Sequence, residues 1–593
     1  MTELNRNKKI KIASLFCFLL CISILGKAQN TEKSVTIPLP SKAQLRWQNY
    51  EQTMFVCLDP CTWQAREYDN HSASLNRINP AELNTDQWCE VAKSWGAGLI
   101  LFVAKHTGGF CWWQTTTTEY GIRNTPWKNG KGDVLKELSE SCKKYGLDLG
   151  IYVYPGDETW GAGIGSGGVT KDPSRQEGYN KVYRRQMTEV LSKYGPVKEV
   201  WFDGSCLINV NDILEKYASD AVILQGPMAN LRWVGNEDGY APFSNWYTLG
   251  SKDLKTGVST AIQSDPFGDM YAPVEVDVPL LKNKGHKWFW APNTDKLILT
   301  TEQLMSMYYK SVGRGAVLLL NSTPDTSGLI PESHVKAYKA FGDEIKRRFD
   351  NPVKETKGEG NSLEITFSQP KEINHVILQE DLSKGQRVLA FSIEGMNEQE
   401  QWNKVYEGTS VGHKRICLFN PVTMKKIKVT FTNTKANPQI SGFAAYNIKG
   451  ISPESEKRDD LGGFYNGLTR KNGPDRKEES GIEIGKWDNS TYNNTDWKEM
   501  SFDLTKYVTK PGQYEVTFEA KDNNKAVLEF KDWEVNMYGG KAKNAIELLK
   551  ESSTFRITRS QQTLDGFPTI FKLKIKGKSD KSSGNITIKM LTY

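Results

Sequence analysis

The chain has 593 residues, and because a single hydrophobic core rarely grows beyond about 300 residues, several domains are expected. Hydrophobic residues make up 38% and charged residues 25% of the chain, an ordinary globular composition that excludes a mostly disordered, fibrous or multi-pass membrane protein. The net charge is +7, but the first 28 residues hold five Lys or Arg against one Glu. The remaining excess is small and gives no indication of nucleic-acid binding.

The amino terminus has the pattern of a secretory signal. Lys8, Lys9 and Lys11 precede an apolar run over 12–25, and Gly26 and Ala28 place small residues before a cut ahead of Gln29. The run is shorter than the roughly 20 apolar residues of a membrane-spanning helix. The sequence therefore predicts a signal peptide over 1–28, export to the periplasm or the extracellular space, and no membrane insertion after cleavage.

The cysteines do not form a recognisable framework. Seven remain after cleavage, and this odd, scattered set predicts free thiols. Cys57 and Cys61 are the closest pair, but no second Cys or His pair accompanies them as a structural zinc site requires. The six histidines are dispersed. No metal and no organic cofactor is expected.

Residues 29–350 alternate short apolar runs with amphipathic segments. Runs of this kind, separated by helices, are typical of parallel strands buried on both faces, and they predict a (β/α) barrel, with an open doubly wound sheet as the alternative. The expected strands are 99–104, 147–153, 199–202, 222–224 and 316–320, and the expected helices are 85–94, 132–145, 176–194, 211–218 and 332–348.

The helical period ends near residue 350. Alternating segments separated by turn residues then predict a β-sandwich over 351–450. A polar linker is expected at 451–460 and a second sandwich, a candidate carbohydrate-binding domain, at 461–593.

Polar residues that follow barrel strands are the first candidates for a site, because barrel enzymes carry their catalytic groups at the carboxyl ends of strands. Such groups follow the expected second strand (105–110), third strand (154–158), fourth strand (Asp203 and Gly204) and fifth strand (236–239). Aromatic residues gather in the same segments. Carboxylates beside flat aromatic rings favour a carbohydrate site, since the rings cover the apolar face of a sugar.

Four motifs in order and spacing resemble glycoside hydrolase family 29. They are AKHTGGFCWW (104–113) with the segment that follows it to 153, VWFDG (200–204), RWVGNEDGYA (232–241) and YYKSVGRGAVLLLNSTPDTSGLI (308–330). The family consists mainly of retaining exo-α-L-fucosidases on a (β/α) barrel. Residues 376–395 and 408–419 resemble the discoidin-like sandwich that follows the barrel in many relatives.

The resemblance assigns roles to individual residues. Asp203 matches the nucleophile and Glu237 the acid/base, with Glu275 as the rival for the second role. A retaining mechanism needs one ionised carboxylate to attack the anomeric carbon and one carboxylic acid to protonate the leaving oxygen. Substrate contacts are expected from His106, Trp112, Trp113, Tyr154, Trp233 and Glu275, and the expected partner is a glycan.

The chain also departs from the family pattern. Relatives usually carry Lys-His-His-Asp-Gly-Phe where this chain has Thr107 and Gly108 after His106, and Phe-Ile-His-Phe-Gly where it has Cys57, Leu58 and Asp59. Smaller side chains at 107 and 108 would leave room near the sugar. Two alternatives to fucose hydrolysis therefore stay open, namely a different L-sugar such as α-L-galactose, and a non-catalytic carbohydrate-binding protein on a degenerate barrel.

Overall fold

The computed structural model describes most of the chain up to residue 451 and the strands that follow. The described residues are 36–235, 237–251, 254, 257, 264–281, 287–451, 481–488, 494–509, 512–520, 527–535, 547–548, 552–559, 569–578 and 583–590. The predicted signal peptide (1–28) and nearly all of the predicted linker (451–460) lie outside them. Within the described ranges, no helix combines the length and the apolar character needed to cross a bilayer.

Eight parallel strands form the first domain. Their spatial order is β5-β4-β3-β2-β1-β10-β9-β6, and a parallel bridge between Leu224 and Leu231 links the two ends of this sheet. This nearly closed ring confirms the predicted (β/α) barrel over the open sheet. The strands are β1 (Gln52–Val56), β2 (Leu99–Lys105), β3 (Asp148–Val153), β4 (Val197–Trp201), β5 (Val222–Leu224), β6 (Arg232–Trp233), β9 (Val274–Val278) and β10 (Val317–Ser322).

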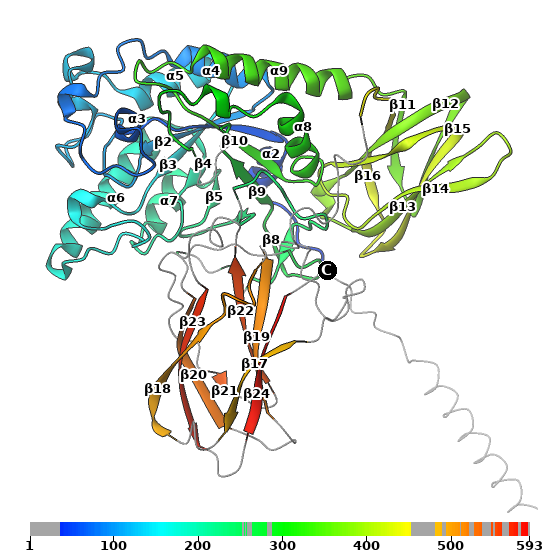
Figure 1. Ribbon diagram of the computed structural model, residues 1–593. Helices are drawn as coiled ribbons and strands as arrows, with labels where there is room; N and C mark the ends of the chain where they lie inside the picture. The colour runs from blue at the N-terminus through cyan, green and yellow to red at the C-terminus, as the bar shows by residue number, and fades with distance from the viewer. Residues whose placement is uncertain are drawn as a thin grey trace, which may run out of the picture. The chain divides into compact units, whose positions relative to one another are not determined.

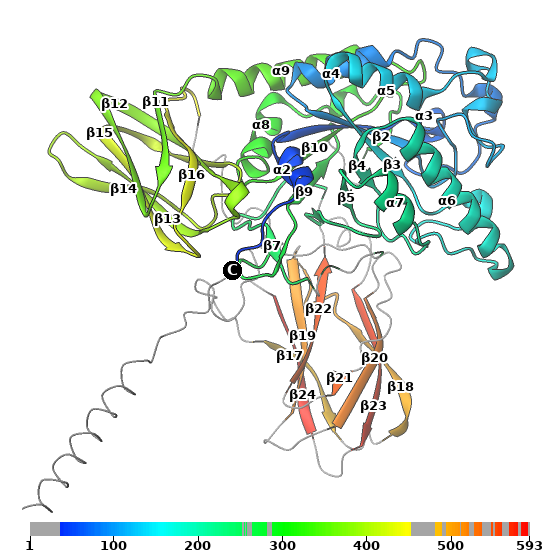
Figure 2. The same cartoon turned by 180° about the vertical axis from the view of Figure 1, so that it is seen from behind.

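Helices such as α4, α5, α6 and α9 lie outside the ring of strands, whereas α2 contacts the barrel interior through Trp47 (Figures 1 and 2). Side-chain caps mark several helix starts: Asn84 accepts from the Asp86 and Gln87 amides before α4, and Asp133 accepts from the Lys136 amide before α5. The helices are α2 (Lys42–Gln48), α3 (Pro60–Gln64), α4 (Thr85–Ser94), α5 (Val134–Tyr145), α6 (Gln176–Lys193), α7 (Asn211–Tyr217), α8 (Thr301–Lys310) and α9 (Glu332–Phe349). A short antiparallel pair, β7 (Thr248–Leu249) and β8 (Met270–Tyr271), lies between β6 and β9.

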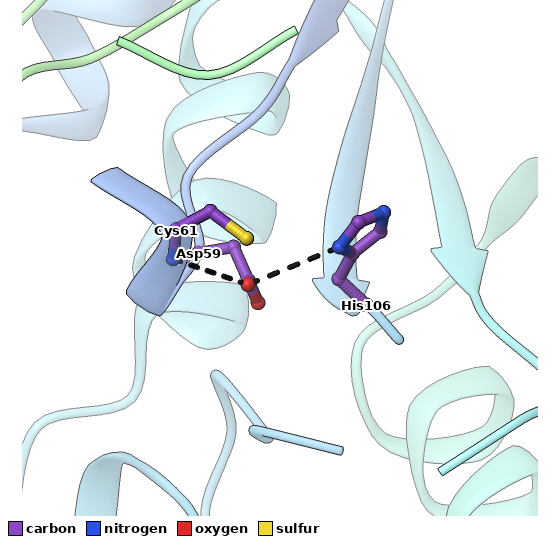
Figure 3. A group of neighbouring side chains, drawn as sticks. All are labelled: Asp59, Cys61 and His106. Carbon is purple, nitrogen blue, oxygen red and sulfur yellow. Dashed lines mark hydrogen bonds and ion pairs between the residues drawn. The ribbon is translucent and has the colours of Figure 1, made fainter. Parts of the chain in front are cut away.

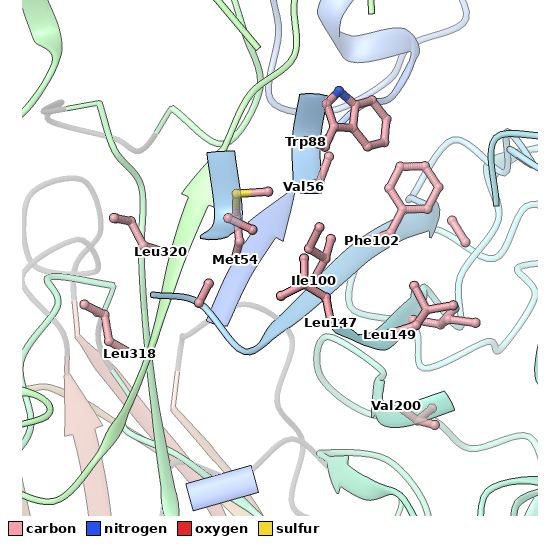
Figure 4. Close-up of a cluster of buried hydrophobic side chains, with 14 of the residues drawn as sticks. Met54, Val56, Trp88, Ile100, Phe102, Leu147, Leu149, Val200, Leu318 and Leu320 are labelled. Atoms are coloured by element: carbon pink, nitrogen blue, oxygen red, sulfur yellow. The ribbon is translucent and has the colours of Figure 1, made fainter. Parts of the chain in front are cut away.

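Side chains along each barrel strand alternate between two cores. One set points outward and packs against the helices, as Figure 4 shows for Met54, Val56, Ile100 and Phe102 beside Trp88 of α4. The other set fills the barrel interior and includes Phe55, Leu99, Leu101, Tyr152, Trp201, Val317 and Leu319. This period of two determines which residues of each strand can reach a site at the mouth of the barrel.

Antiparallel strands form the rest of the described chain. The first group has the order β11-β16-β12-β15-β13-β14, and its two longest strands, β12 and β15, pair with each other. Its members are β11 (Lys354–Glu359), β12 (Ser362–Glu380), β13 (Val388–Met396), β14 (Trp402–Gly408), β15 (Arg415–Thr434) and β16 (Gln439–Tyr446).

The second group consists of two four-stranded sheets, β17-β24-β19-β22 and β18-β23-β20-β21, as the sandwich pattern predicts. Its core includes Trp487, which is 2% exposed and donates to the Glu519 carbonyl, so this indole is not a surface platform for sugar. The strands are β17 (Ile482–Asp488), β18 (Asn494–Asp503), β19 (Gly512–Ala520), β20 (Val527–Val535), β21 (Glu547–Leu548), β22 (Ser552–Arg559), β23 (Ile570–Lys578) and β24 (Ser583–Met590).

Candidate active site

Asp203 lies just beyond the carboxyl end of β4, in a strained backbone conformation. Its φ angle is 49°, in the left-handed region, and Gly204 follows with φ 100°. The Tyr152 hydroxyl, from the neighbouring strand β3, donates to Asp203 Oδ2 at 2.7 Å. A non-glycine residue held in this region at a strand end is typical of functional sites, where the surrounding structure imposes the strain.

The carboxyl of Asp203 is reached by solvent but is surrounded by protein on most sides. This desolvation raises the pKa of Asp203 to about 6, the Tyr152 hydrogen bond counteracts the rise, and the charge of Glu237 adds to it. Glu237 is therefore near enough for its charge to act on the Asp203 carboxyl.

We expect Tyr152→Phe to shift the pH dependence of catalysis. Loss of the hydroxyl removes the interaction that lowers the pKa of Asp203, so a larger fraction of this carboxyl is protonated at mildly acidic pH. The acidic limb of kcat/KM, which reports groups in the free enzyme, should therefore move to higher pH. Tyr50→Phe serves as the control, because Tyr50 bonds to Asp148 rather than to Asp203. An unchanged limb in Tyr152→Phe would contradict the assigned contact.

Glu237 is half-buried and follows β6, the sixth strand of the barrel. The prediction that it follows the fifth strand is wrong, because β6 has only two residues and gives no strand signal in the sequence. The Trp288 indole donates to Glu237 Oε2 at 3.3 Å. Trp288 is itself held at its backbone, where its amide donates to Glu67 Oε2 at 2.9 Å and its carbonyl accepts from Asn321 Nδ2 at 2.9 Å. Trp288 is thus fixed by the Glu67 side chain and by Asn321 of β10, and its indole in turn orients the Glu237 carboxyl.

Glu275, the rival for the acid/base role, lies deeper in the barrel. It has no exposed surface, and its Oε1 accepts from the Trp201 indole at 2.6 Å. Burial, together with the neighbouring carboxyl of Glu199, raises the pKa of Glu275 well above its usual range. The indole of Trp47, from α2, donates to Glu199 at 3.2 Å. These contacts place Glu275 in a buried carboxyl pair within the barrel.

Asp277 is a third carboxyl that the sequence analysis missed. It lies two residues beyond Glu275 on the same face of β9, and the Trp233 indole donates to its Oδ1 at 2.7 Å. Burial, followed by the charge of Glu237, raises the pKa of Asp277 well above its usual range, and Asp203 contributes to the same effect. The alternation Val-Glu-Val-Asp-Val over 274–278 is the signal that identifies both acids as inward-facing.

The raised pKa of Asp277 favours the protonated, neutral form of this carboxyl. Asp277→Asn keeps the shape and an acceptor for Trp233, so we expect kcat to stay within about tenfold of wild type. Asp277→Ala leaves the buried indole N–H without a partner, at a cost of about 1–3 kcal/mol, and should lower both kcat and the melting temperature. Steady-state kinetics and calorimetry on the two variants provide the test. Equal impairment of both would show that Asp277 works in its ionised form.

Comparisons with known proteins decide the family. The family model described as "Alpha-L-fucosidase" matches residues 40–348, which is more than half of the chain, and the "F5/8 type C domain" model matches residues 332–444. Alpha-L-fucosidase 1 of Arabidopsis thaliana is 30% identical over 492 residues, which cover 74% of this chain and 94% of the plant protein. The chain belongs to the α-L-fucosidase family, glycoside hydrolase family 29. This confirms the resemblance seen in the sequence. It also confirms that the protein is a glycoside hydrolase and not a non-catalytic carbohydrate-binding protein.

Solved structures agree with this family assignment. A Bacteroides thetaiotaomicron protein, provisionally described as an α-L-fucosidase, is 32% identical with a TM-score of 0.65 and covers 70% of this chain and 100% of its own. A glycoside hydrolase 29 family member from an unknown rumen bacterium is 25% identical with a TM-score of 0.62 and covers 93% of this chain and 99% of its own. The Ruminococcus gnavus GH29 fucosidase in complex with fucose shares the fold, with a TM-score of 0.62 and 24% sequence identity. The match covers 71% of this chain and 96% of the Ruminococcus gnavus chain.

Three residues expected to contact the family's sugar lie beside the acids. His106 follows β2 and its ring centroid lies 5.9 Å from that of Tyr152 and 4.9 Å from that of Phe289; burial lowers its pKa to about 4, so the imidazole is neutral. Tyr154 is 5% exposed and its hydroxyl accepts from the Gly165 amide, while Trp233 is bonded to Asp277.

Trp112 and Trp113 require a correction. Neither indole has any exposed surface, and both belong to the core between the strands and the helices. Trp112 packs on Trp63 and Phe110, and Trp113 donates to Glu189 of α6 at 3.0 Å. The prediction that these two residues contact substrate is wrong, because the chain folds back after His106 to pair Cys111 with Lys105, and both indoles then enter the core between the strands and the helices.

The family's missing Asp at position 108 is replaced in space by another acid. A Cβ at Gly108 would lie 2.0 Å from Asp69 Oδ2, so only glycine leaves room for this carboxylate. Asp69 accepts from the Tyr120 hydroxyl at 2.7 Å and from Gln64 Nε2 at 2.6 Å. The room expected at position 108 is thus filled by Asp69 rather than left open for a larger sugar.

Proposed function

We propose that the protein is a retaining, exo-acting α-L-fucosidase that removes terminal α-L-fucosyl residues from glycans by double displacement. The observations that support the proposal are that Asp203 and Glu237 follow the carboxyl ends of two barrel strands, β4 and β6, and that the charge of Glu237 raises the pKa of Asp203. Membership in the α-L-fucosidase family supports the sugar, and the two carboxyls support the chemistry.

In the first step, ionised Asp203 attacks the anomeric carbon and forms a glycosyl ester, while protonated Glu237 donates its proton to the leaving oxygen. In the second step, Glu237 takes a proton from water, and the resulting hydroxide releases the sugar and regenerates the Asp203 carboxylate. Tyr152 donates to Asp203, and Trp288 donates to Glu237, so each acid has a fixed orientation throughout.

Glu275 is not assigned to proton transfer in this proposal. Its buried position against Trp201 and Glu199 separates it from any leaving group at the mouth. Its expected role as a substrate contact is likewise replaced by a structural one, the support of the barrel interior beneath the catalytic acids.

A different L-sugar is the second candidate, because Cys57 and Thr107 stand where relatives usually carry histidines. Kinetics on nitrophenyl α-L-fucoside and α-L-galactoside distinguish the two sugars. Proton NMR of the first product tests the mechanism, because retention releases the α-anomer before mutarotation. Preference for the galactoside would show that the substrate sugar is α-L-galactose and not α-L-fucose. Initial release of the β-anomer would overturn the double-displacement mechanism.

Export is part of the proposal. The basic residues followed by an apolar run before Gln29 support cleavage after Ala28 and a periplasmic or extracellular location. N-terminal sequencing of the protein recovered outside the cytoplasm should begin at Gln29, and an intact amino terminus there would contradict cleavage.

A further inference from the structure

Three side chains of different chemistry converge beside the catalytic acids. Asp59 caps the amino terminus of α3 and Cys61 lies in the first turn of that helix, whereas His106 follows the end of β2, the parallel neighbour of β1. A carboxylate oxygen of Asp59, Sγ of Cys61 and a ring nitrogen of His106 all lie within 4.8 Å of one another. Figure 3 shows the carboxyl of Asp59 between the other two side chains, with its Oδ2 3.9 Å from His106 Nδ1.

The cluster is buried and one of its polar atoms lacks a partner. Asp59 is 1%, Cys61 0% and His106 7% exposed. Asp59 Oδ2 accepts from the Cys61 amide at 3.4 Å, whereas Oδ1 has no hydrogen-bond partner among the described residues. The ion-pair contact of this carboxyl is His106, and no Lys or Arg of the described residues pairs with it. An unpaired oxygen of a buried carboxyl is costly unless something else bonds to it.

We propose that Asp59, Cys61 and His106 bind a zinc ion. Carboxylate, thiolate and imidazole are the three ligand types that zinc accepts, whereas Mg²⁺ and Ca²⁺ require oxygen ligands throughout. Zinc bonds of about 2.0 Å to O or N and about 2.3 Å to S are commensurate with the spacing of the three atoms. Binding requires Cys61 as a thiolate and Asp59 as a carboxylate, so the thiol proton, and the carboxyl proton where Asp59 is protonated, pass to solvent and two anionic ligands balance the divalent charge.

Three protein ligands leave a fourth zinc position for water or for a hydroxyl of a bound sugar. The site adjoins the catalytic group through His106, whose ring lies beside Tyr152, the residue that donates to Asp203. The inference does not depend on the proposed glycosidase activity, because its test measures metal binding alone.

Calorimetric titration of the full chain with Zn²⁺, after chelator treatment and under a non-thiol reductant, tests the site. We expect one zinc per chain and a higher melting temperature with zinc, because binding to the folded state stabilises it. Asp59→Asn and Cys61→Ser should each lose this binding. Cys142→Ser, which changes a buried thiol on α5, and Asp69→Asn, which changes a carboxyl already bonded to Tyr120, are matched controls that should retain it.

Cobalt substitution provides a measurement that needs no variant. Co²⁺ bound to Cys61 should show a thiolate-to-cobalt charge-transfer band in the near ultraviolet, and Zn²⁺ should displace it. The proposal is overturned if wild type binds no zinc, if both site variants bind as much as wild type, or if bound cobalt shows no such band.

Discussion

Asp203→Ala is expected to lower kcat on an α-L-glycoside by about 10⁴-fold or more, the range found when a covalent nucleophile is removed. Without the carboxylate, no ester to the anomeric carbon forms. No remaining group activates a water molecule to attack that carbon from the face that Asp203 occupied. Azide is small enough to occupy the space of the missing carboxyl. Added azide should therefore restore turnover and release the β-glycosyl azide, which NMR identifies.

The strained backbone at Asp203 offers a control for folding. Its φ of 49° suits glycine, so Asp203→Gly relieves strain and should fold at least as stably as wild type while remaining inactive. Asp212→Ala removes a surface carboxylate of α7 that pairs with Arg184 and should leave kcat unchanged. Activity of Asp203→Ala near the wild-type level without azide would exclude this residue as the nucleophile.

The barrel was predictable because its signals are local. Apolar runs bounded by turn residues matched β2 and β5, and the helical period gave α4 over Thr85–Ser94 with its Asn84 cap. Asp203 was found for the same reason, since it directly follows a buried strand and sits in a recognisable motif. The two-residue β6 lacks such a signal, and Glu237 was consequently placed after the wrong strand.

Contacts between distant segments were not predictable from residue types alone. Trp112 and Trp113 have the composition of a sugar platform, but their burial depends on the direction that the chain takes after β2. Asp69 fills the space beside Gly108 across 39 positions of sequence. Asp277 could be recognised as an inward-facing acid only once the bounds of β9 were known, because it lies two residues after Glu275 and therefore on the same face of that strand. A sequence motif therefore located the nucleophile, whereas its electrostatic environment became visible only with strand register.

The leaving group separates the two glutamates that compete for the acid/base role. Glu237→Ala should lower kcat by about 10²–10⁴-fold on a natural glycan, whose leaving oxygen needs a proton, and much less on a dinitrophenyl glycoside, whose leaving group departs as an anion. Glu275→Gln keeps the acceptor for Trp201 and should affect both substrates equally, through barrel stability. The ratio of the two kcat values is thus the deciding measurement. A ratio that changes in Glu275→Gln and stays constant in Glu237→Ala would reverse the assignment, because only the proton donor distinguishes a poor leaving group from a good one.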